Sequence, residues 1–345
     1  MIFKNLNILK PLKSSSKKPN IAIIGSGSWA TALTKIFTDS QNHVFWYVRD
    51  VKKANSIRSK NRNLSYLPEI KFKSKRITVS SNINDVVSSC SWVVLAIPSS
   101  FLEKTIKQIN IPLKNKFIVS AVKGIIPESK STLGEHLNKK HEVSWEQFVV
   151  ITGPSHAEEI ALERTSYLTL ASIKKSNAGQ LRKLINTKYI QTKISNDVIG
   201  VEYAGALKNI FALAIGIAHG LSYGDNFQSV LLSNAIREMD AFLKKISKSQ
   251  RNINDSAYLG DLLVTGYSTF SRNRRFGNLI GRGHTIKGAK LEMSMIAEGY
   301  YAVLYIYELS QKYKINTPII DTVYRILYKQ EGPKKNFKKL TKLLD

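Results

Sequence analysis

The chain has 345 residues, 43% of them hydrophobic, which suits a globular protein of two ordinary domains. Its 52 lysines and arginines against 25 acidic residues give a formal charge of +27, which favours an anionic partner: nucleic acid, an acidic membrane or a phosphorylated small molecule. A single cysteine, Cys90, excludes an intramolecular disulfide framework and a cysteine-rich metal site. It also fits a reducing compartment, so we expect a cytoplasmic protein.

Two segments bear on targeting. Residues 1–19 hold five lysines and three consecutive serines without an acid, a composition that favours a disordered basic arm, with a transit peptide as the alternative. The most apolar run, 210–218, is far shorter than the roughly 20 residues needed to span a membrane. We therefore predict no stable membrane insertion and interpret 210–218 as part of a buried helix.

A glycine-rich turn opens the folded part of the chain. The β-branched run 21–24 precedes the stretch "GSGSWA" (25–30), and apolar residues with helical spacing follow it. Gly25 allows a sharp turn, and Gly27 lets the backbone approach a pyrophosphate at the helix N-terminus. Ala30 takes the third position of this GxGxxG-type motif. The order of strand, turn and helix predicts a dinucleotide-binding site.

The end of the next predicted strand, 43–49, bears on the choice of cofactor. Arg49 lies 22 residues after Gly27, where an NAD-binding protein usually has an acid that binds the ribose hydroxyls. An arginine there favours the 2′-phosphate of NADP, whereas Asp50, directly after it, is compatible with NAD. We predict NADP(H) as the preferred cofactor and NAD(H) as the alternative, although a solvated strand end also accounts for Arg49.

Further buried strands are predicted at 91–100, 116–124 and 148–159. They end in small or phosphate-binding residues, which include Pro98, Lys123 and the segment from Gly153 through Pro154 to Ser155. Because ligands collect at the carboxyl ends of the strands in an open parallel sheet, we expect these residues to face one crevice with the Gly25 turn. Lys123 follows a strand and precedes a glycine, which favours a functional lysine over one more surface lysine.

The pattern changes after a last predicted strand at 189–195. Long apolar helices follow from Asp197, so we predict a dinucleotide-binding domain at 20–196 and a helical substrate domain at 197–345. Lys208 lies among small residues on its helix. Partial burial would lower the pKa of this lysine and let it donate a proton to a ketone near neutral pH. A lysine that extends from its helix into solvent is the alternative.

The stretch "GDLLVTGYSTFSRNRRFG" (260–277) holds a compact set of hydrogen-bond donors. Asp261 precedes an apolar run, and Ser271, Arg272 and Asn273 follow it. A guanidinium flanked by a hydroxyl and an amide can surround a phosphate dianion. Nucleic-acid binding would instead require aromatic side chains among the basic ones and a continuous basic stripe. The stretch therefore predicts a phosphorylated small molecule, and not nucleic acid, as the partner.

Together these segments resemble the bacterial NAD(P)-dependent glycerol-3-phosphate dehydrogenase family. The resemblance covers about residues 20 to 300 and rests on motifs that occur in the family's order: "GSGSWATAL", "NLSYLP", "AIPS", "AVKG", "GPSHAEE", "VEYAGALKNIFALAIGIAHGL", "GDN", "GDLLVTGYSTFSRNRRFG" and "IAEG". It implies an α/β Rossmann-type N-terminal domain followed by an all-α, 6-phosphogluconate-dehydrogenase-like C-terminal domain. It further implies reversible reduction of dihydroxyacetone phosphate to sn-glycerol 3-phosphate, a precursor of glycerophospholipids, by a homodimer.

The resemblance also assigns roles by motif. Lys208 would be the general acid, with Lys123 adding positive potential beside the ketone oxygen and Asp261 orienting Lys208 or a substrate hydroxyl. The substrate would be held by Lys123, Gly153, Ser155, Lys208, Asp261, Ser271, Arg272 and Asn273. The cofactor would be lined by Gly25, Gly27, Ser28, Trp29, Arg49, Lys123, Ala157, Arg272, Ile296 and Glu298.

Two positions depart from the family pattern. This chain has His156 where the family commonly has phenylalanine, and Gly266 where the family commonly has cysteine. Neither departure removes a group from the mechanism. We expect His156 to face solvent, and an altered pH dependence is the alternative. None of the six histidines pairs with another at metal-ligand spacing near acids, so we predict no metal site.

Other function classes remain open from the residues themselves. A related two-domain hydroxyacid dehydrogenase would share the same plan. A four-electron nucleotide-sugar dehydrogenase would need a cysteine nucleophile, and Cys90 lies just before a predicted strand, which disfavours it. A cofactor-sensing or nucleic-acid-binding regulator would explain the charge but would not require Lys208, Asp261 and the 271–273 cluster together.

Overall fold

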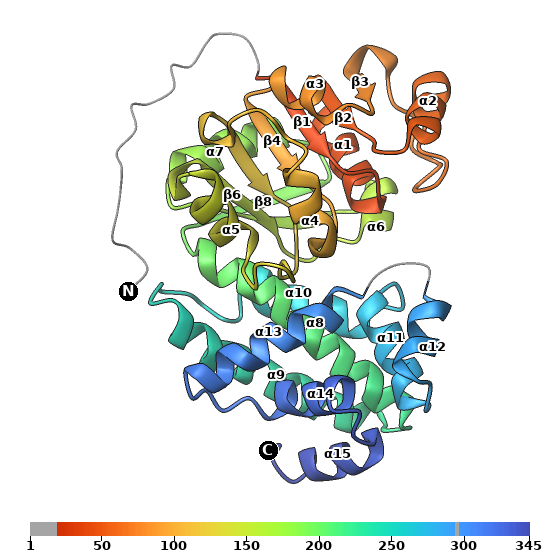
Figure 1. Cartoon of the computed structure of the whole chain (residues 1–345), viewed down its shortest axis with the longest axis vertical. Helices are drawn as coiled ribbons and strands as arrows, with labels where there is room; N and C mark the ends of the chain where they lie inside the picture. The colour runs from red at the N-terminus through yellow and green to blue at the C-terminus, as the bar shows by residue number, and fades with distance from the viewer. Residues whose placement is uncertain (1–18, 294–296) are drawn as a thin grey trace.

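An eight-stranded sheet forms the N-terminal half of the protein and lies above a helical C-terminal half along the long axis (Figure 1). The computed structural model describes residues 19–293 and 297–345. The strands are β1 (Ile21–Ile24), β2 (Val44–Tyr47), β3 (Ile77–Ser80), β4 (Trp92–Leu95), β5 (Phe117–Ser120), β6 (Phe148–Thr152), β7 (Ser166–Ala171) and β8 (Ile190–Ser195). Every strand predicted from the sequence is present, whereas β3 and β7 were not predicted. The predicted arm at 1–19 lies, apart from residue 19, outside the described residues.

The strand order is β3-β2-β1-β4-β5-β6-β7-β8. The order reverses between β1 and β4, which makes this the topological switch point of the sheet. All neighbours from β3 to β6 are parallel, but β7 is antiparallel to β6 and β8 follows the direction of β7. The sheet is therefore parallel except at the β6–β7 pair, where the strand direction reverses. After β6 the chain returns and adds β7 alongside it in the opposite direction. The hydrophobic pattern of a strand carries no information about its direction.

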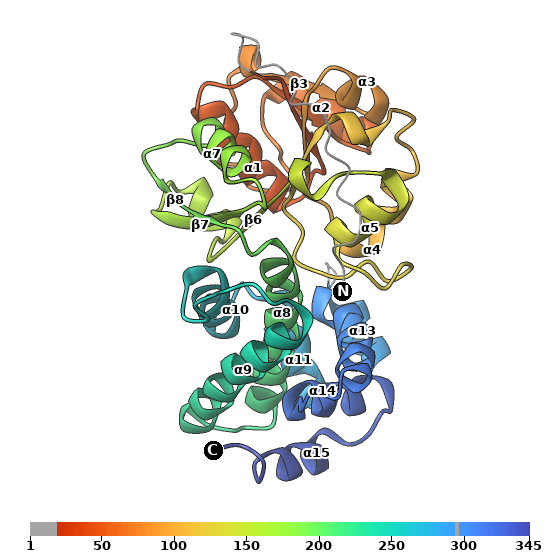
Figure 2. The same ribbon diagram turned by 90° about the vertical axis from the view of Figure 1, so that its left-hand side faces the viewer.

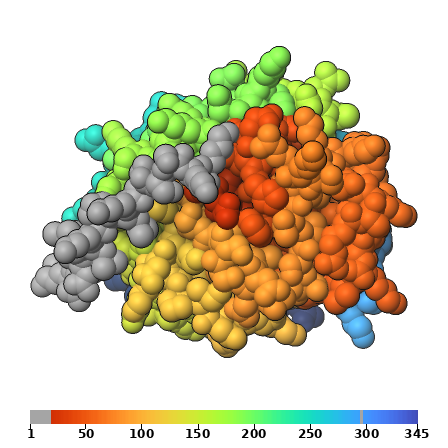
Figure 3. All heavy atoms as spheres, turned by 90° about the horizontal axis from the view of Figure 1, so that it is seen from above, coloured from red at the N-terminus to blue at the C-terminus, as the bar shows by residue number. Residues whose placement is uncertain are grey.

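Alternating side chains of the strands build two cores, one on each face of the sheet. Ile21 and Ile23 pack under α1, α2, α6 and α7, whereas Ala22 and Ile24 pack under α3, α4 and α5. These helices are α1 (Ser28–Asp39), α2 (Val51–Lys60), α3 (Ile83–Ser88), α4 (Ser99–Ile106), α5 (Leu133–His141), α6 (Ala157–Ala161) and α7 (Lys175–Leu184). The second core continues into the helical half. From above, the surface of the sheet domain fills most of the view (Figure 3).

The helix α8 (Val198–Gly220) is the centre of the C-terminal half, with the other helices around it (Figure 2). They are α9 (Asp225–Ile246), α10 (Asp261–Tyr267), α11 (Arg272–Gly281), α12 (Ile286–Glu292), α13 (Glu298–Lys312), α14 (Pro318–Tyr328) and α15 (Pro333–Leu340). Among the described residues, α8 is the one helix long and apolar enough to cross a membrane, and its apolar window is entirely buried. Its residues 210–218 are therefore part of a core helix, as predicted.

Glycines bring α8 and α11 into backbone contact. A Cβ at Gly277 of α11 would lie 2.2 Å from the carbonyl oxygen of Leu213, and one at Gly216 of α8 would lie 2.1 Å from that of Arg274. Both distances are shorter than any van der Waals contact, so only glycine permits this approach. The close packing fixes the first turn of α11, which carries the predicted phosphate-binding residues, relative to α8 and Lys208.

Candidate active site

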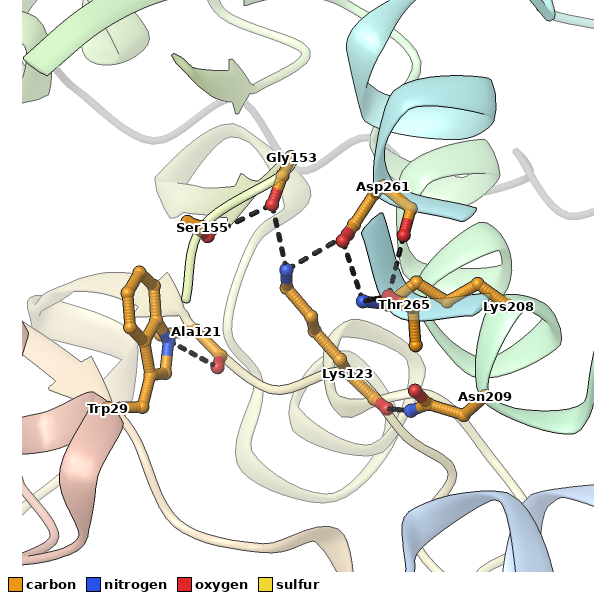
Figure 4. Close-up of polar contacts among 9 residues, drawn as sticks. All are labelled: Trp29, Ala121, Lys123, Gly153, Ser155, Lys208, Asn209, Asp261 and Thr265. Atoms are coloured by element: carbon orange, nitrogen blue, oxygen red, sulfur yellow. Dashed lines mark hydrogen bonds and ion pairs between the residues drawn. The ribbon is translucent and has the colours of Figure 1, made fainter. Parts of the chain in front are cut away.

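Two lysines and one carboxylate form a buried cluster between the two halves of the protein (Figure 4). Asp261, the first residue of α10, accepts a hydrogen bond from Lys208 of α8 through Oδ1 at 2.7 Å and from Lys123 through Oδ2 at 2.9 Å. Asp261 is 1% exposed and Lys208 is 6% exposed. Lys123 follows β5, so the sheet domain and two helices of the C-terminal half each contribute one charged group.

Burial sets the protonation behaviour of Lys208. Removal from water lowers the pKa of this lysine to about 8, although the negative charge of Asp261 opposes the shift; the positive charge of Lys123 adds to it. Lys208 is thus close to half protonated near pH 8. A group with this pKa can both donate and accept a proton near neutral pH, as the sequence analysis predicts for this lysine.

Asp261 remains ionised although it is buried. Burial would raise the pKa of this carboxyl, but the charges of Lys123 and Lys208 and their hydrogen bonds more than offset that effect and leave the pKa lowered. The carboxylate therefore serves as a fixed counter-charge for the two ammonium groups. Both of its oxygens hold a lysine, which supports orientation of Lys208, one of its two predicted roles.

Each lysine keeps one N–H group for a further partner. The ammonium of Lys208 also donates to Thr265 Oγ1 at 2.8 Å, and that of Lys123 donates to the carbonyl oxygen of Gly153 at 2.9 Å. An ammonium group has three N–H donors, so one remains on each lysine after two contacts. Two unused donors on either side of one carboxylate can converge on a single oxygen atom of a ligand.

Thr265 and Asn209 complete the cluster and were not predicted. Thr265 donates to the carbonyl oxygen of Asp261 at 2.6 Å, so its lone pairs face Lys208. Asn209 donates to the carbonyl oxygen of Lys123 at 2.6 Å and ties α8 to the end of β5. The one available signal was spacing: Thr265 lies one helical turn after Asp261, and Asn209 lies next to Lys208.

The loop after β6 lies against the cluster. Gly153 has a φ of +106°, and a Cβ there would be 2.7 Å from the carbonyl oxygen of Tyr167, so glycine is required. Its own carbonyl oxygen accepts hydrogen bonds from both Lys123 and Ser155 (Figure 4). Gly153 and Ser155, both predicted to bind the substrate, thus lie directly beside Lys123.

The predicted phosphate-binding residues begin α11. Ser271 caps this helix by accepting from the amide of Arg274, and Asn273 Oδ1 accepts from the amide of Gly299 at 2.9 Å. The amide NH₂ of Asn273 therefore remains a donor. Arg272 is half-buried, and its guanidinium makes no hydrogen bond or ion pair to any residue within 19–293 and 297–345. Its charge acts on the carboxyl of Glu298.

Glu298 links Arg272 to the end of the sheet. Its carboxylate accepts from the amide and hydroxyl of Ser99, at the start of α4. A Cβ at Gly124, the residue after Lys123, would lie 2.4 Å from Glu298 Oε2. Burial raises the pKa of Glu298, against the hydrogen bonds from Ser99 and the charge of Arg272. Asn273 bonds Gly299, and the neighbouring Glu298 lies against Gly124, so the α11 donors lie on the Lys123 side of the cluster.

The turn after β1 has the geometry of a dinucleotide cradle. Gly25 has a φ of +133°, and a Cβ there would lie 2.3 Å from the carbonyl oxygen of Ala96. Gly27 faces open space, with nothing within 4 Å of its Cβ position, and it begins α1 without a side-chain cap. Ser28 and Trp29 follow in the first turn of α1, which has no acidic residue. The amides at this helix N-terminus therefore suit an anionic pyrophosphate.

The remaining predicted cofactor residues lie around this turn. Trp29 donates to the carbonyl oxygen of Ala121 at 3.1 Å, beside Lys123 (Figure 4). Arg49 is exposed, with its guanidinium 5.8 Å from the ring centre of Phe101. Ala157 is buried at the start of α6. Ile296 lies outside the described residues.

Asp50 is already engaged in the fold. Its side chain caps α2 and accepts from the amide of Lys53 at 2.9 Å. This hydrogen bond lowers the pKa of Asp50. A carboxylate committed to a helix cap is less available to ribose hydroxyls, whereas the neighbouring guanidinium of Arg49 has no competing hydrogen bond among the residues the structure describes.

The prediction that His156 faces solvent is wrong. It is half-buried in the loop that carries Gly153 and Ser155, and its Nε2 is shielded from water without a hydrogen-bond partner in the described parts of the chain. The ring centre lies 6.0 Å from that of Phe270, which precedes α11. The expectation failed because the neighbour comes from the other half of the protein, which local sequence does not reveal.

The single cysteine and the metal-binding residue types complete the survey of the described residues. Cys90 is buried, and burial raises the pKa of its thiol to about 12, so it is not an activated nucleophile. Within 19–293 and 297–345, no group of three or more histidine, cysteine, aspartate or glutamate residues is placed to hold a metal ion.

A Rossmann-type sheet with a glycine cradle, joined to a helical domain that supplies a buried lysine, defines a two-domain NAD(P)-dependent dehydrogenase. Sequence comparison makes the class specific. Residues 20–178 match the model of the NAD-dependent glycerol-3-phosphate dehydrogenase N-terminus, and residues 197–338 match that of the C-terminus. The chain belongs to the NAD-dependent glycerol-3-phosphate dehydrogenase family.

Individual relatives agree with this assignment. The chain is 33% identical over 323 residues to glycerol-3-phosphate dehydrogenase [NAD(P)+] from an Exiguobacterium strain, covering 93% of this chain and 94% of the relative. It is 34% identical to the protein of the same name from Clostridium botulinum, covering 93% and 96%. The crystal structure of glycerol-3-phosphate dehydrogenase from Coxiella burnetii superimposes with a TM-score of 0.85 at 28% identity, over 94% of this chain and 99% of that one. The predicted family and fold class are confirmed.

Proposed function

We propose that the protein reduces dihydroxyacetone phosphate to sn-glycerol 3-phosphate, reversibly and with NAD(P)H, and thereby supplies glycerophospholipid synthesis. The observation that carries the proposal is the buried cluster in which Asp261 bridges Lys123 and Lys208, each with one unused N–H donor. Membership of the glycerol-3-phosphate dehydrogenase family supports the choice of substrate.

Lys208 is the general acid for reduction in this proposal. The nicotinamide cofactor supplies the hydride that reduces C2 of the substrate. As negative charge develops on the C2 oxygen, Lys208 donates its third proton to it, and the positive charge of Lys123 stabilises the same oxygen. Because burial lowers the pKa of Lys208 to about 8, the proton leaves at a smaller free-energy cost than from a free lysine. In the reverse direction, neutral Lys208 accepts the proton of the substrate hydroxyl.

Arg272 and Asn273 bind the phosphate in this proposal. The guanidinium offers paired donors for two phosphate oxygens, and the NH₂ of Asn273 adds a third direction. The oxygen of that amide is held by Gly299, so the NH₂ group is already oriented. Ser271 acts mainly by starting α11, and its hydroxyl proton remains available to the phosphate. Phosphate binding at this end aims the ketone at the two lysines.

NADP(H) is the preferred cofactor in this proposal. Arg49 is exposed at the end of β2, where it can reach a 2′-phosphate, and Asp50 is engaged by the cap of α2. The residues from Gly25 to Trp29 would hold the pyrophosphate and Glu298 the nicotinamide end, with Ala157 and Arg272 beside it. We further propose a cytoplasmic homodimer whose only ligands are small molecules, without nucleic acid or membrane insertion.

The test is oxidation of NADPH, and separately of NADH, followed at 340 nm with dihydroxyacetone phosphate as substrate. Arg272→Ala removes the phosphate-binding guanidinium and should raise KM by roughly 10- to 150-fold, the range for hydrogen bonds to charged groups. Arg275→Ala is the matched control, because Arg275 is exposed on the same helix and should leave KM unchanged. Wild-type protein that binds NADPH but does not oxidise it with this substrate would refute the proposal in favour of a related hydroxyacid dehydrogenase.

A further inference from the structure

Asp197 is the centre of a second buried polar cluster, at the point where the chain passes from the sheet to the helical half. It follows β8 and caps α8 by accepting from the amide of Gly200 at 3.1 Å. Its carboxylate also accepts two hydrogen bonds from the guanidinium of Arg251, at 2.6 and 3.1 Å, and one from the hydroxyl of Tyr258 at 2.6 Å. These bonds occupy the roughly four acceptor positions of a carboxylate, so the side chain is a fixed point at the start of α8.

Tyr258 connects this fixed point to the carboxylate of the active site. It lies in a π-helical turn, Ser256–Gly260, and Asp261 follows that turn as the first residue of α10. Turns of this kind are rare and are often found at functional sites. Lys208 is on α8, the helix that Asp197 caps. Both members of the ion pair between Asp261 and Lys208 are therefore anchored at Asp197, one through the turn and the other through α8.

The helix α10 depends on such an anchor. It has 7 residues, and no side chain caps its N-terminus. A helix this short is not stable in water on its own, so contacts with the rest of the protein determine where it begins. Its outer face is exposed at Leu263 and Tyr267. The buried ring of Tyr258 and its hydrogen bond hold the residues that come directly before the helix.

We propose that Tyr258 is a positioning residue, which holds Asp261 at hydrogen-bonding distance from Lys208 through its own bond to Asp197. It does not touch the substrate. The inference rests on the proposed function, in which Lys208 protonates the C2 oxygen. When the turn loses its attachment to Asp197, the distance between Asp261 and Lys208 increases and their electrostatic interaction weakens.

The effect of a weaker interaction on Lys208 has a definite sign. Among the described residues, the groups whose charges interact with Lys208 are Asp261, Lys123 and His156. Burial is the largest influence and lowers the pKa of Lys208, whereas Asp261 raises it and Lys123 lowers it. A more distant Asp261 therefore lowers the pKa of Lys208 further. Because reduction requires protonated Lys208, activity is then lost at a lower pH.

The test is Tyr258→Phe, which removes the hydroxyl and keeps the buried ring. The kcat/KM for NADPH-dependent reduction of dihydroxyacetone phosphate should fall by about 2- to 10-fold at pH 8, the range for one hydrogen bond, and by less at pH 6. The pH at which reduction declines should move down by up to about 1 unit. In combination with Asp261→Asn the variant should add a loss of no more than about 2-fold, because Tyr258 acts through the charge that asparagine has already removed.

Tyr189→Phe is the matched control. Tyr189 is also a buried tyrosine, and its hydroxyl donates to Asp39 at 2.7 Å within the sheet domain. This control should lower the melting temperature to a similar extent and keep the wild-type pH profile.

Three results would show that the positioning role is wrong while the proposed function stands. Tyr258→Phe would lower kcat/KM by the same factor at every pH, leave it unchanged, or multiply the loss that Asp261→Asn causes. If wild-type protein that binds NADPH does not reduce dihydroxyacetone phosphate, the proposed function is wrong and this inference falls with it.

Discussion

Replacing Asp261 by asparagine tests whether its charge sets the proton affinity of Lys208. The substitution keeps the shape of the side chain but removes the negative charge 2.7 Å from the lysine nitrogen. A pair of charges at about 4 Å in an effective dielectric of about 20 interacts by about 4 kcal/mol, or about 3 pK units. A retained hydrogen bond offsets part of this, so we expect a fall of about 2 pK units. The pKa of Lys208 would move from about 8 to about 6.

The consequence is a loss of activity that grows with pH. Reduction requires protonated Lys208, so it proceeds below the pKa of this lysine and declines above it. With a pKa that falls from about 8 to about 6, the protonated fraction should drop about 2-fold at pH 6, about 10-fold at pH 7 and about 50-fold at pH 8.

The assay is kcat/KM for NADPH-dependent reduction between pH 5.5 and 9, with circular dichroism to verify folding. Asp255→Asn, which removes a surface carboxylate paired with Lys193, is the control and should reproduce the wild-type profile. A loss in Asp261→Asn that is the same at every pH would refute the electrostatic argument. It would leave Asp261 with only an orienting role.

Three further predictions follow from single contacts. Arg49→Glu should weaken NADPH binding by about 10- to 150-fold, because it replaces the donor to the 2′-phosphate with a negative charge that repels it. The affinity for NADH should barely change. Equal losses of affinity for both cofactors in fluorescence titrations would exclude this role. Gly277→Ala should destabilise the protein by about 2 kcal/mol or more because its Cβ would overlap Leu213, whereas Gly179→Ala, with open space around it, should stabilise α7 by roughly 0.5 to 1 kcal/mol; urea denaturation measures both. Glu238→Gln should cost about 1 to 3 kcal/mol, because each oxygen of the buried carboxyl group accepts from an amide at the start of α14 and glutamine places an NH₂ group against one of these amides. An unchanged melting temperature would contradict this.

Much of the fold could be predicted from local sequence. The strand at 21–24, the glycine turn and α1 form one continuous pattern, and each of its requirements is local: an extended run, a residue with positive φ and helical spacing. The burial of Lys208 was also predictable, because the apolar run around it leaves the helix no solvent face. These features depend on residues within one or two helical turns of one another.

The features that sequence reasoning missed depend on contacts between distant segments. The direction of β7 follows from how the chain re-enters the sheet beside β6, which the residues of the strand itself do not determine. Thr265 is a functional neighbour only because α10 packs against α8. His156 was expected in solvent because nothing near it in sequence indicates that Phe270 covers it. In each case the neighbour that determines the structure or the role of the residue lies many positions away in the sequence.

The way the two halves are joined explains why the site forms between them. Lys123 belongs to the sheet domain, whereas Asp261 and Lys208 both belong to the helical domain. The ion pair between Lys123 and Asp261 therefore exists only when the two halves are joined. Asn209 and Glu298 add hydrogen bonds across the same junction, to Lys123 and to Ser99. The groups that carry the proposed chemistry therefore also fix the relative position of the domains, and a substitution that removes their charge should affect both.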